Sequence, residues 1–87
     1  MTKRIWKYPL QVTDSQTITI PKGSEILSVQ EQAGSPTLWV LVDDRLVTYS
    51  RRTFRIYGTG HALPEDPGKF IGTVQLNNAR VWHVFEE

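Results

Sequence analysis

The chain has 87 residues, no cysteine and a formal net charge of +1, and 39% of its residues are hydrophobic. This apolar fraction excludes a disordered chain, the length allows one small core, and the near-neutral charge gives no overall attraction to nucleic acid or to a membrane surface. The absence of cysteine excludes a disulfide framework and a thiolate nucleophile. We therefore expect a single domain, residues 1–87, in a reducing compartment, and the absence of a signal-peptide pattern or a long apolar run favours the cytoplasm.

Short segments with a period of two predict strands along the first half of the chain. Residues 6–12 alternate apolar and polar side chains, and Pro9 favours a sheet edge because proline cannot donate to the ladder. Residues 38–42 are apolar on both faces, a pattern typical of a central strand covered on both sides, and we assign Trp39 to the core. Further strands are predicted at 17–20 and 26–32, with turns at 13–16, 21–24 and 33–36.

The second half of the chain continues the same pattern. Extended segments are predicted at 46–49, 53–57, 70–76 and 80–85. Residues 61–69 contain two prolines and a glycine and predict a loop, and Asn77 and Asn78 predict a hairpin turn because asparagine tolerates positive φ. No helical period is present. The whole pattern predicts an all-β, single-domain antiparallel sandwich or partly open barrel of about seven short strands.

Several segments spread over nearly the whole chain carry a resemblance to one protein family. The longest runs from Arg52 to His61, and the others are Lys7-Tyr8-Pro9-Leu10, Ile26-Leu27-Ser28-Val29-Gln30, Leu38-Trp39-Val40-Leu41-Val42-Asp43, Ile71-Gly72-Thr73 and His83-Val84-Phe85-Glu86. These segments are similar to DUF7352, a domain of unknown function. The resemblance implies a bacteriophage or prophage origin and expression inside a bacterial cell, and it implies no catalytic residue. The chain departs from the family pattern at Ala62, where we expect proline.

Arginine is concentrated in the segment from Arg45 to His61, which contains no acidic residue. Arginine side chains bind phosphate in a bidentate manner, exposed amides beside glycine can close on an anion, and aromatic rings can stack on a base. The segment therefore suggests a pocket for an anionic, nucleotide-like ligand. Its candidate residues are Arg51, Arg52, Arg55, Tyr57, Thr59 and His61. Gly58-Thr59-Gly60 is not a Walker or dinucleotide fingerprint, because it lacks the Lys-Ser/Thr ending and the third glycine.

A simpler interpretation is that these arginines lie on the solvent face of a strand and form surface ion pairs. The acids considered for such pairs are Asp43, Asp44, Glu65 and Asp66. Alternation along the strand puts Arg55 and Tyr57 on one face and Phe54 on the other, so Arg55 and Tyr57 can act together.

No catalytic or metal-binding set is apparent in the sequence. His61 and His83 are the only histidines, and no carboxylates stand at metal-ligand spacing from them. We expect His83 to be a hydrogen-bonded cross-strand residue and His61, in the loop, to be the functional histidine. A hydroxyl with His61 and Asp66 can be drawn as a hydrolase triad, but the spacing does not support it. We therefore predict a protein that is not an enzyme and needs no metal or cofactor.

Trp6 and Tyr8 are the candidates for a partner surface, since they lie on the expected edge strand beside basic residues. Unpaired strand edges and a low net charge also favour a homo-oligomer. The first hypothesis is an accessory protein that binds a bacterial host protein, in counter-defence or host takeover, through a sheet edge or residues 58–68. The alternatives are sequestration of an anionic nucleotide signal, and binding of single-stranded nucleic acid, against which the net charge counts.

Overall fold

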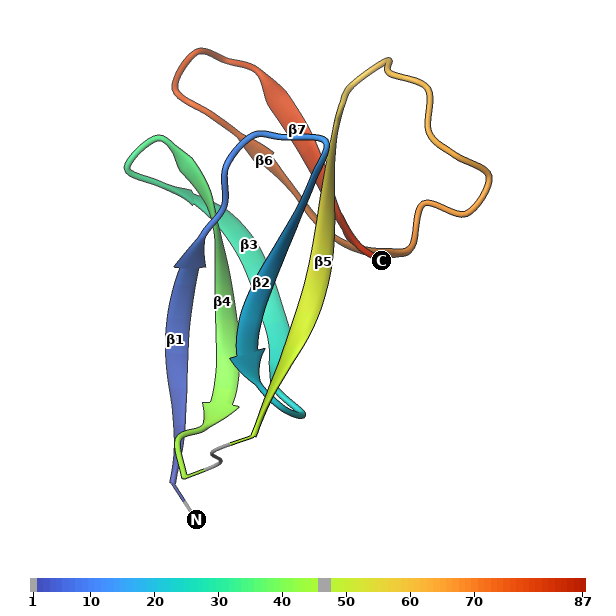
Figure 1. Cartoon of the computed structure of the whole chain (residues 1–87). Helices are drawn as coiled ribbons and strands as arrows, with labels where there is room; N and C mark the ends of the chain where they lie inside the picture. The colour runs from blue at the N-terminus through green and yellow to red at the C-terminus, as the bar shows by residue number, and fades with distance from the viewer. Residues whose placement is uncertain (1, 46–47) are drawn as a thin grey trace.

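The computed structural model describes residues 2–45 and 48–87, and these residues form seven strands and no helix (Figure 1). The strands are β1 (Lys3–Pro9), β2 (Ser15–Pro21), β3 (Glu25–Gln32), β4 (Ser35–Asp43), β5 (Tyr49–Gly58), β6 (Lys69–Gln75) and β7 (Val81–Glu86). One antiparallel sheet has the order β1-β4-β3 and the other has the order β2-β5-β7-β6. The predicted all-β fold is confirmed, as a two-layer sandwich and not as a closed barrel.

The core lies between the two sheets and takes residues from the inner faces of strands β2 to β7. In β4, Leu38, Val40 and Val42 are at most 1% exposed, and in β5 Phe54 and Ile56 belong to the same buried cluster. The other members of the cluster are Leu10, Ile20, Val29, Val74, Leu76 and Val84. Because side chains alternate across a strand, each sheet gives one face to this interior and turns the other face away from it.

The strand positions follow the predictions, with shifted ends. Strand β1 is an edge strand, as Pro9 indicated, but it begins at Lys3 and ends at Pro9. Strand β5 is one continuous strand of 10 residues where two extended segments were predicted. The start of the first predicted segment, Leu46 and Val47, lies outside the described residues.

Two turns differ from their predicted form. Ala33 and Gly34 have φ of 51° and 84°, as in the type I′ turns that match the twist of a hairpin, so Ser35 and Pro36 belong to β4 and not to the turn. In the β6–β7 hairpin the positive φ falls on Ala79, at 64°, and not on the preceding asparagines. Asn78 instead accepts a hydrogen bond at its side chain from the backbone N–H of Arg80, at 3.0 Å.

The assignment of Trp39 to the core is wrong. Trp39 alternates with the buried Leu38 and Val40, so its side chain lies on the outer face of the three-stranded sheet, where it is half-buried. A continuous apolar run suggests burial on both sides. With two layers, however, the outer face of β4 has no third layer of described residues above it.

The loop between β5 and β6 swings away from the sandwich and returns to the chain end (Figure 1). It ends at Gly68, whose φ is +96°. An added Cβ at Gly68 would lie 2.3 Å from the carbonyl oxygen of Glu86. Positive φ and backbone contact together therefore require glycine here.

We expect Gly68→Ala to lower the free energy of unfolding by about 2 to 4 kcal/mol, because strain at positive φ adds to overpacking against Glu86. Gly23→Ala is the matched control, since Gly23 has a φ of +79° but nothing within 4 Å of an added Cβ. It should cost only about 1 kcal/mol of backbone strain. Urea denaturation of the two variants measures the difference, and equal losses would contradict the role of the Glu86 contact.

Candidate functional site

A hollow of about 190 Å³ opens at the end of the sandwich where β5 finishes and β7 begins. It is formed because β5 and β7 pair side by side, with Gly58 opposite Trp82. The lining residues are Gly58, Thr59, His61, Arg80, Val81 and Trp82. The hollow therefore combines two aromatic rings and a cation from two segments that lie about 20 residues apart in the sequence.

A tight turn places His61 in the lining of the hollow. The backbone N–H of His61 donates to the carbonyl of Gly58 at 3.1 Å, and Gly60 within the turn has a φ of 87°. The imidazole lies directly on Gly58, where an added Cβ would be 2.8 Å from Cε1 of His61. The ring also meets Trp82 edge to face, with centroids 6.5 Å apart. A side chain at position 58 would therefore displace the imidazole from this place.

Thr59 is engaged on the outer side of the same turn. Its hydroxyl lies 2.8 Å from Nε2 of His83, and the hydroxyl of Thr73 lies 2.9 Å from Nδ1 of the same ring. Both ring nitrogens of His83 are therefore occupied by side chains from neighbouring segments. This agrees with the predicted cross-strand role of His83 and leaves Thr59 less free for a ligand than the sequence suggested.

Arg80 supplies the exposed charge of the hollow. Its backbone is held by Asn78, but among the described residues its guanidinium has no hydrogen-bond or ion-pair partner. Sequence reasoning missed Arg80 and Trp82, because they stand in a different hairpin from the arginine-rich segment. Only the pairing of Gly58 with Trp82 brings the two segments together.

Arg52 is a structural residue that connects β5 to β7 and to the β2–β3 turn. Its side chain lies on the inner face of β5 and forms a bidentate pair with Glu86, in which the second bond, from Nη2 to Oε1, is 2.7 Å. Nη1 donates to the backbone carbonyl of Ser24 at 2.6 Å. The bond to Glu86 raises the pKa of the Arg52 guanidinium, although burial opposes this. All three nitrogens are used within the chain, so Arg52 is not available to a ligand in this arrangement.

Arg55 and Tyr57 share the outer face of β5, as alternation predicted. Arg55 forms an ion pair with Glu87, with Nη2 2.7 Å from Oε2, and this carboxylate raises the pKa of the guanidinium. Tyr57 packs edge to face on Phe85 with ring centroids 5.7 Å apart. Its buried hydroxyl has no hydrogen-bond partner among the described residues.

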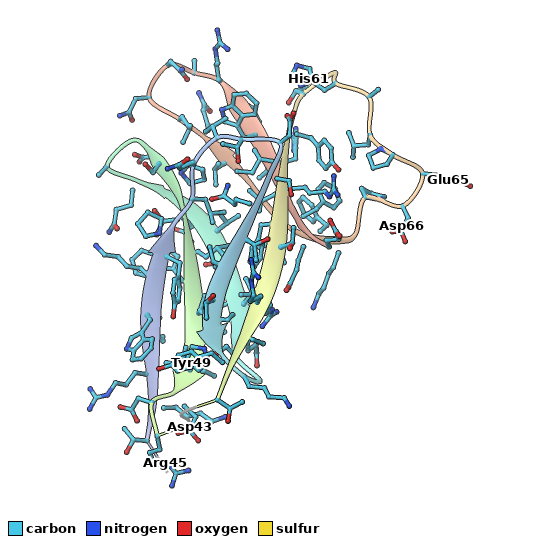
Figure 2. All side chains as sticks on the ribbon, viewed as in Figure 1. Asp43, Arg45, Tyr49, His61, Glu65 and Asp66 are labelled. Atoms are coloured by element: carbon cyan, nitrogen blue, oxygen red, sulfur yellow. The ribbon has the colours of Figure 1, made fainter. Side chains whose placement is uncertain are left out.

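The six predicted ligand residues do not converge on one place. Thr59 and His61 line the hollow, whereas Arg51 lies seven residues before Gly58 on β5, or roughly 23 Å away at about 3.3 Å per residue. The acids suggested as partners for the arginines of β5 also differ from the observed ones. Asp43 forms an ion pair with Arg45 instead, and both residues lie at the opposite end of the sandwich from His61 (Figure 2). The C-terminal strand provides the partners instead, because it runs beside β5.

The loop acids do not approach His61. Figure 2 shows Glu65 and Asp66 at the outer end of the loop, away from His61, and Asp66 accepts a hydrogen bond from the backbone N–H of Gly68 at 3.1 Å. Within residues 2–45 and 48–87, no group of three potential metal ligands comes together, and no helix is long and apolar enough to cross a membrane.

The two predicted partner-surface residues differ in exposure. Trp6 is 37% exposed on the edge strand β1, whereas Tyr8 packs against the core cluster. Burial, and secondly Tyr49, raises the pKa of the Tyr8 hydroxyl. Trp6 is therefore the more accessible of the two.

We expect Arg52→Met to lower the free energy of unfolding by about 1 to 2 kcal/mol, since it leaves the part-buried Glu86 carboxylate and the Ser24 carbonyl without a donor. Arg55→Met, which breaks the more exposed pair with Glu87, is the control and should have a clearly smaller effect. Chemical denaturation compares the two. A loss from Arg55→Met as large as that from Arg52→Met would contradict the structural role of Arg52.

The family comparison agrees with the resemblance seen in the sequence. The model of the family described as Domain of unknown function (DUF7352) matches residues 1–87. No curated protein and no solved structure matches the chain. Because the family match extends over the full length given, the chain belongs to the DUF7352 family.

Proposed function

We propose that this chain is a small, non-enzymatic accessory protein of phage or prophage origin that binds a host protein in the bacterial cytoplasm. The observation that carries the proposal is the hollow between His61 and Trp82, with the exposed cation of Arg80 in its lining. Aromatic and arginine side chains dominate the energetics of protein interfaces, and the residues at their centres fill pockets of the partner. The hollow offers such a pocket.

The size of the hollow favours an anchoring side chain over a whole small molecule. Sites that enclose a ligand have volumes of roughly 300 to 1,000 Å³. The hollow measures about 190 Å³, which suits one partner side chain better than a nucleotide. An acidic side chain would find Arg80 there, and an apolar or aromatic one would find Trp82 and His61.

The arginine pairs also argue against nucleotide sequestration. Phosphate recognition needs unpaired guanidinium groups that converge, but Arg52 and Arg55 are neutralised by Glu86 and Glu87. Binding of single-stranded nucleic acid needs a row of free cations along a groove, and the same pairs interrupt it. A protein partner requires neither arrangement.

A binding function suits the proposed setting. The family resemblance supports a phage or prophage origin, and we propose that the chain acts there by occupying the surface of a host factor. Counter-defence and host takeover are both actions of this kind. The loop from Gly58 to Gly68 lies next to the hollow and extends the surface that a partner can contact.

We expect Arg80→Ala and His61→Ala to lose a host protein that the unchanged chain retains, because each removes one wall of the anchor pocket. Tagged variants are expressed in bacterial cells, cross-linked and purified, and the retained proteins are identified by mass spectrometry. Arg51→Ala is the matched control, since it removes an exposed arginine that does not line the hollow. It should leave retention unchanged.

Native mass spectrometry of the same preparations tests the main alternative. A bound nucleotide, together with thermal stabilisation by that nucleotide, would replace the proposal with sequestration. An identical set of retained proteins in all variants would also contradict an anchor role for the hollow.

A further inference from the structure

The outer face of the three-stranded sheet carries apolar side chains that no described segment covers. Ile5 of β1 is 59% exposed and Leu27 of β3 is 43% exposed. Strand β4 lies between these two strands, and its Trp39 and Leu41 are each half-buried. Ile5 is registered with Leu41, and a bulge in β3 sets Leu27 beside Trp39. We call Ile5, Leu27, Trp39 and Leu41 the outer apolar patch.

The composition of β4 is that of a strand covered on both sides. Its inner residues Leu38, Val40 and Val42 fill the core, and Trp39 and Leu41 give the other face the same apolar character. Such strands occur where a further layer packs on the sheet. The structure supplies that layer on one side only.

The strands that flank the outer apolar patch carry opposite charges on this face. Lys3 and Lys7 lie on β1, and Lys7 reaches across the sheet to Gln32, with Nζ 3.1 Å from the amide oxygen. Glu25 lies on β3, at the same level as Ile5, because both residues are registered with Leu41. Strand β1 therefore contributes two lysines to this face, and strand β3 contributes an acid.

We propose that a second copy of this chain covers the outer apolar patch, in a two-fold, face-to-face dimer whose axis runs parallel to β4. This axis exchanges the β1 and β3 sides, so that Glu25 of one subunit lies over Ile5 of the other, between Lys3 and Lys7. A two-fold axis across the strands would instead place lysines over lysines. Charge complementarity selects the first arrangement.

The arrangement has a consequence for the proposed host-binding function, on which the dimer itself does not depend. A rotation about an axis parallel to β4 keeps each residue at the same height along that axis, so corresponding ends of the two subunits lie side by side. Both hollows then lie at the same end of the dimer and can engage two copies of a partner together, which raises the effective affinity.

Sedimentation velocity of the purified chain tests the dimer. We expect a dimer at micromolar concentration and physiological salt, and at least a tenfold weaker association for Ile5→Ser, for Glu25→Lys and for Lys7→Glu. The double variant Lys7→Glu/Glu25→Lys restores the opposite charges and should recover most of the affinity. Lys69→Glu, on β6 of the other sheet, makes the same charge change away from the patch and should leave the dimer unchanged.

Circular dichroism of each variant confirms that these exposed substitutions leave the strands intact. A chain that sediments as a monomer throughout would overturn the proposal, and so would a dimer that is indifferent to Ile5→Ser. Weakening by both single charge reversals without recovery in the double variant would overturn the proposed axis. Because this assay contains no host protein, its outcome is independent of the retention experiment on the hollow.

Discussion

Each strand of this protein turns only one face toward the interior, because two sheets enclose a single core. This constraint sorts the side chains of every strand into two sets. In β5 it sends Phe54 and Ile56 into the core and leaves Arg55 and Tyr57 on the outer surface. In β4 the same constraint turns Trp39 outward, although its neighbours are among the most completely buried residues of the chain.

The C-terminal strand links the core to the candidate site. Strand β7 runs between β5 and β6, so one of its ends supplies Glu86, which pairs with Arg52, and its other end supplies Trp82, which lines the hollow. The arginines that are most prominent in the sequence are used largely for holding this strand in place. The less prominent Arg80, in the adjoining hairpin, carries the charge that remains accessible at the hollow.

The protein presents two surfaces of different character. The hollow at the end of the sandwich is small and combines aromatic rings with a cation, which suits a single anchoring group from a partner. The outer apolar patch lies on the outer face of a sheet, and its flanking charges are complementary to themselves under a two-fold rotation. Self-association and partner binding can therefore occur together without competition for the same residues.

The sequence by itself determined the all-β class, the approximate strand positions, the edge position of β1 and the shared face of Arg55 and Tyr57. These features follow from local alternation and from proline chemistry, which act over a few neighbouring residues. Only the tertiary structure decided that Arg52 pairs with Glu86, that Trp39 lies outside the core, and that His61 meets Trp82. Each of these depends on which strands become neighbours, and that choice is made by the packing of the whole core, because a period of two is the same for every strand.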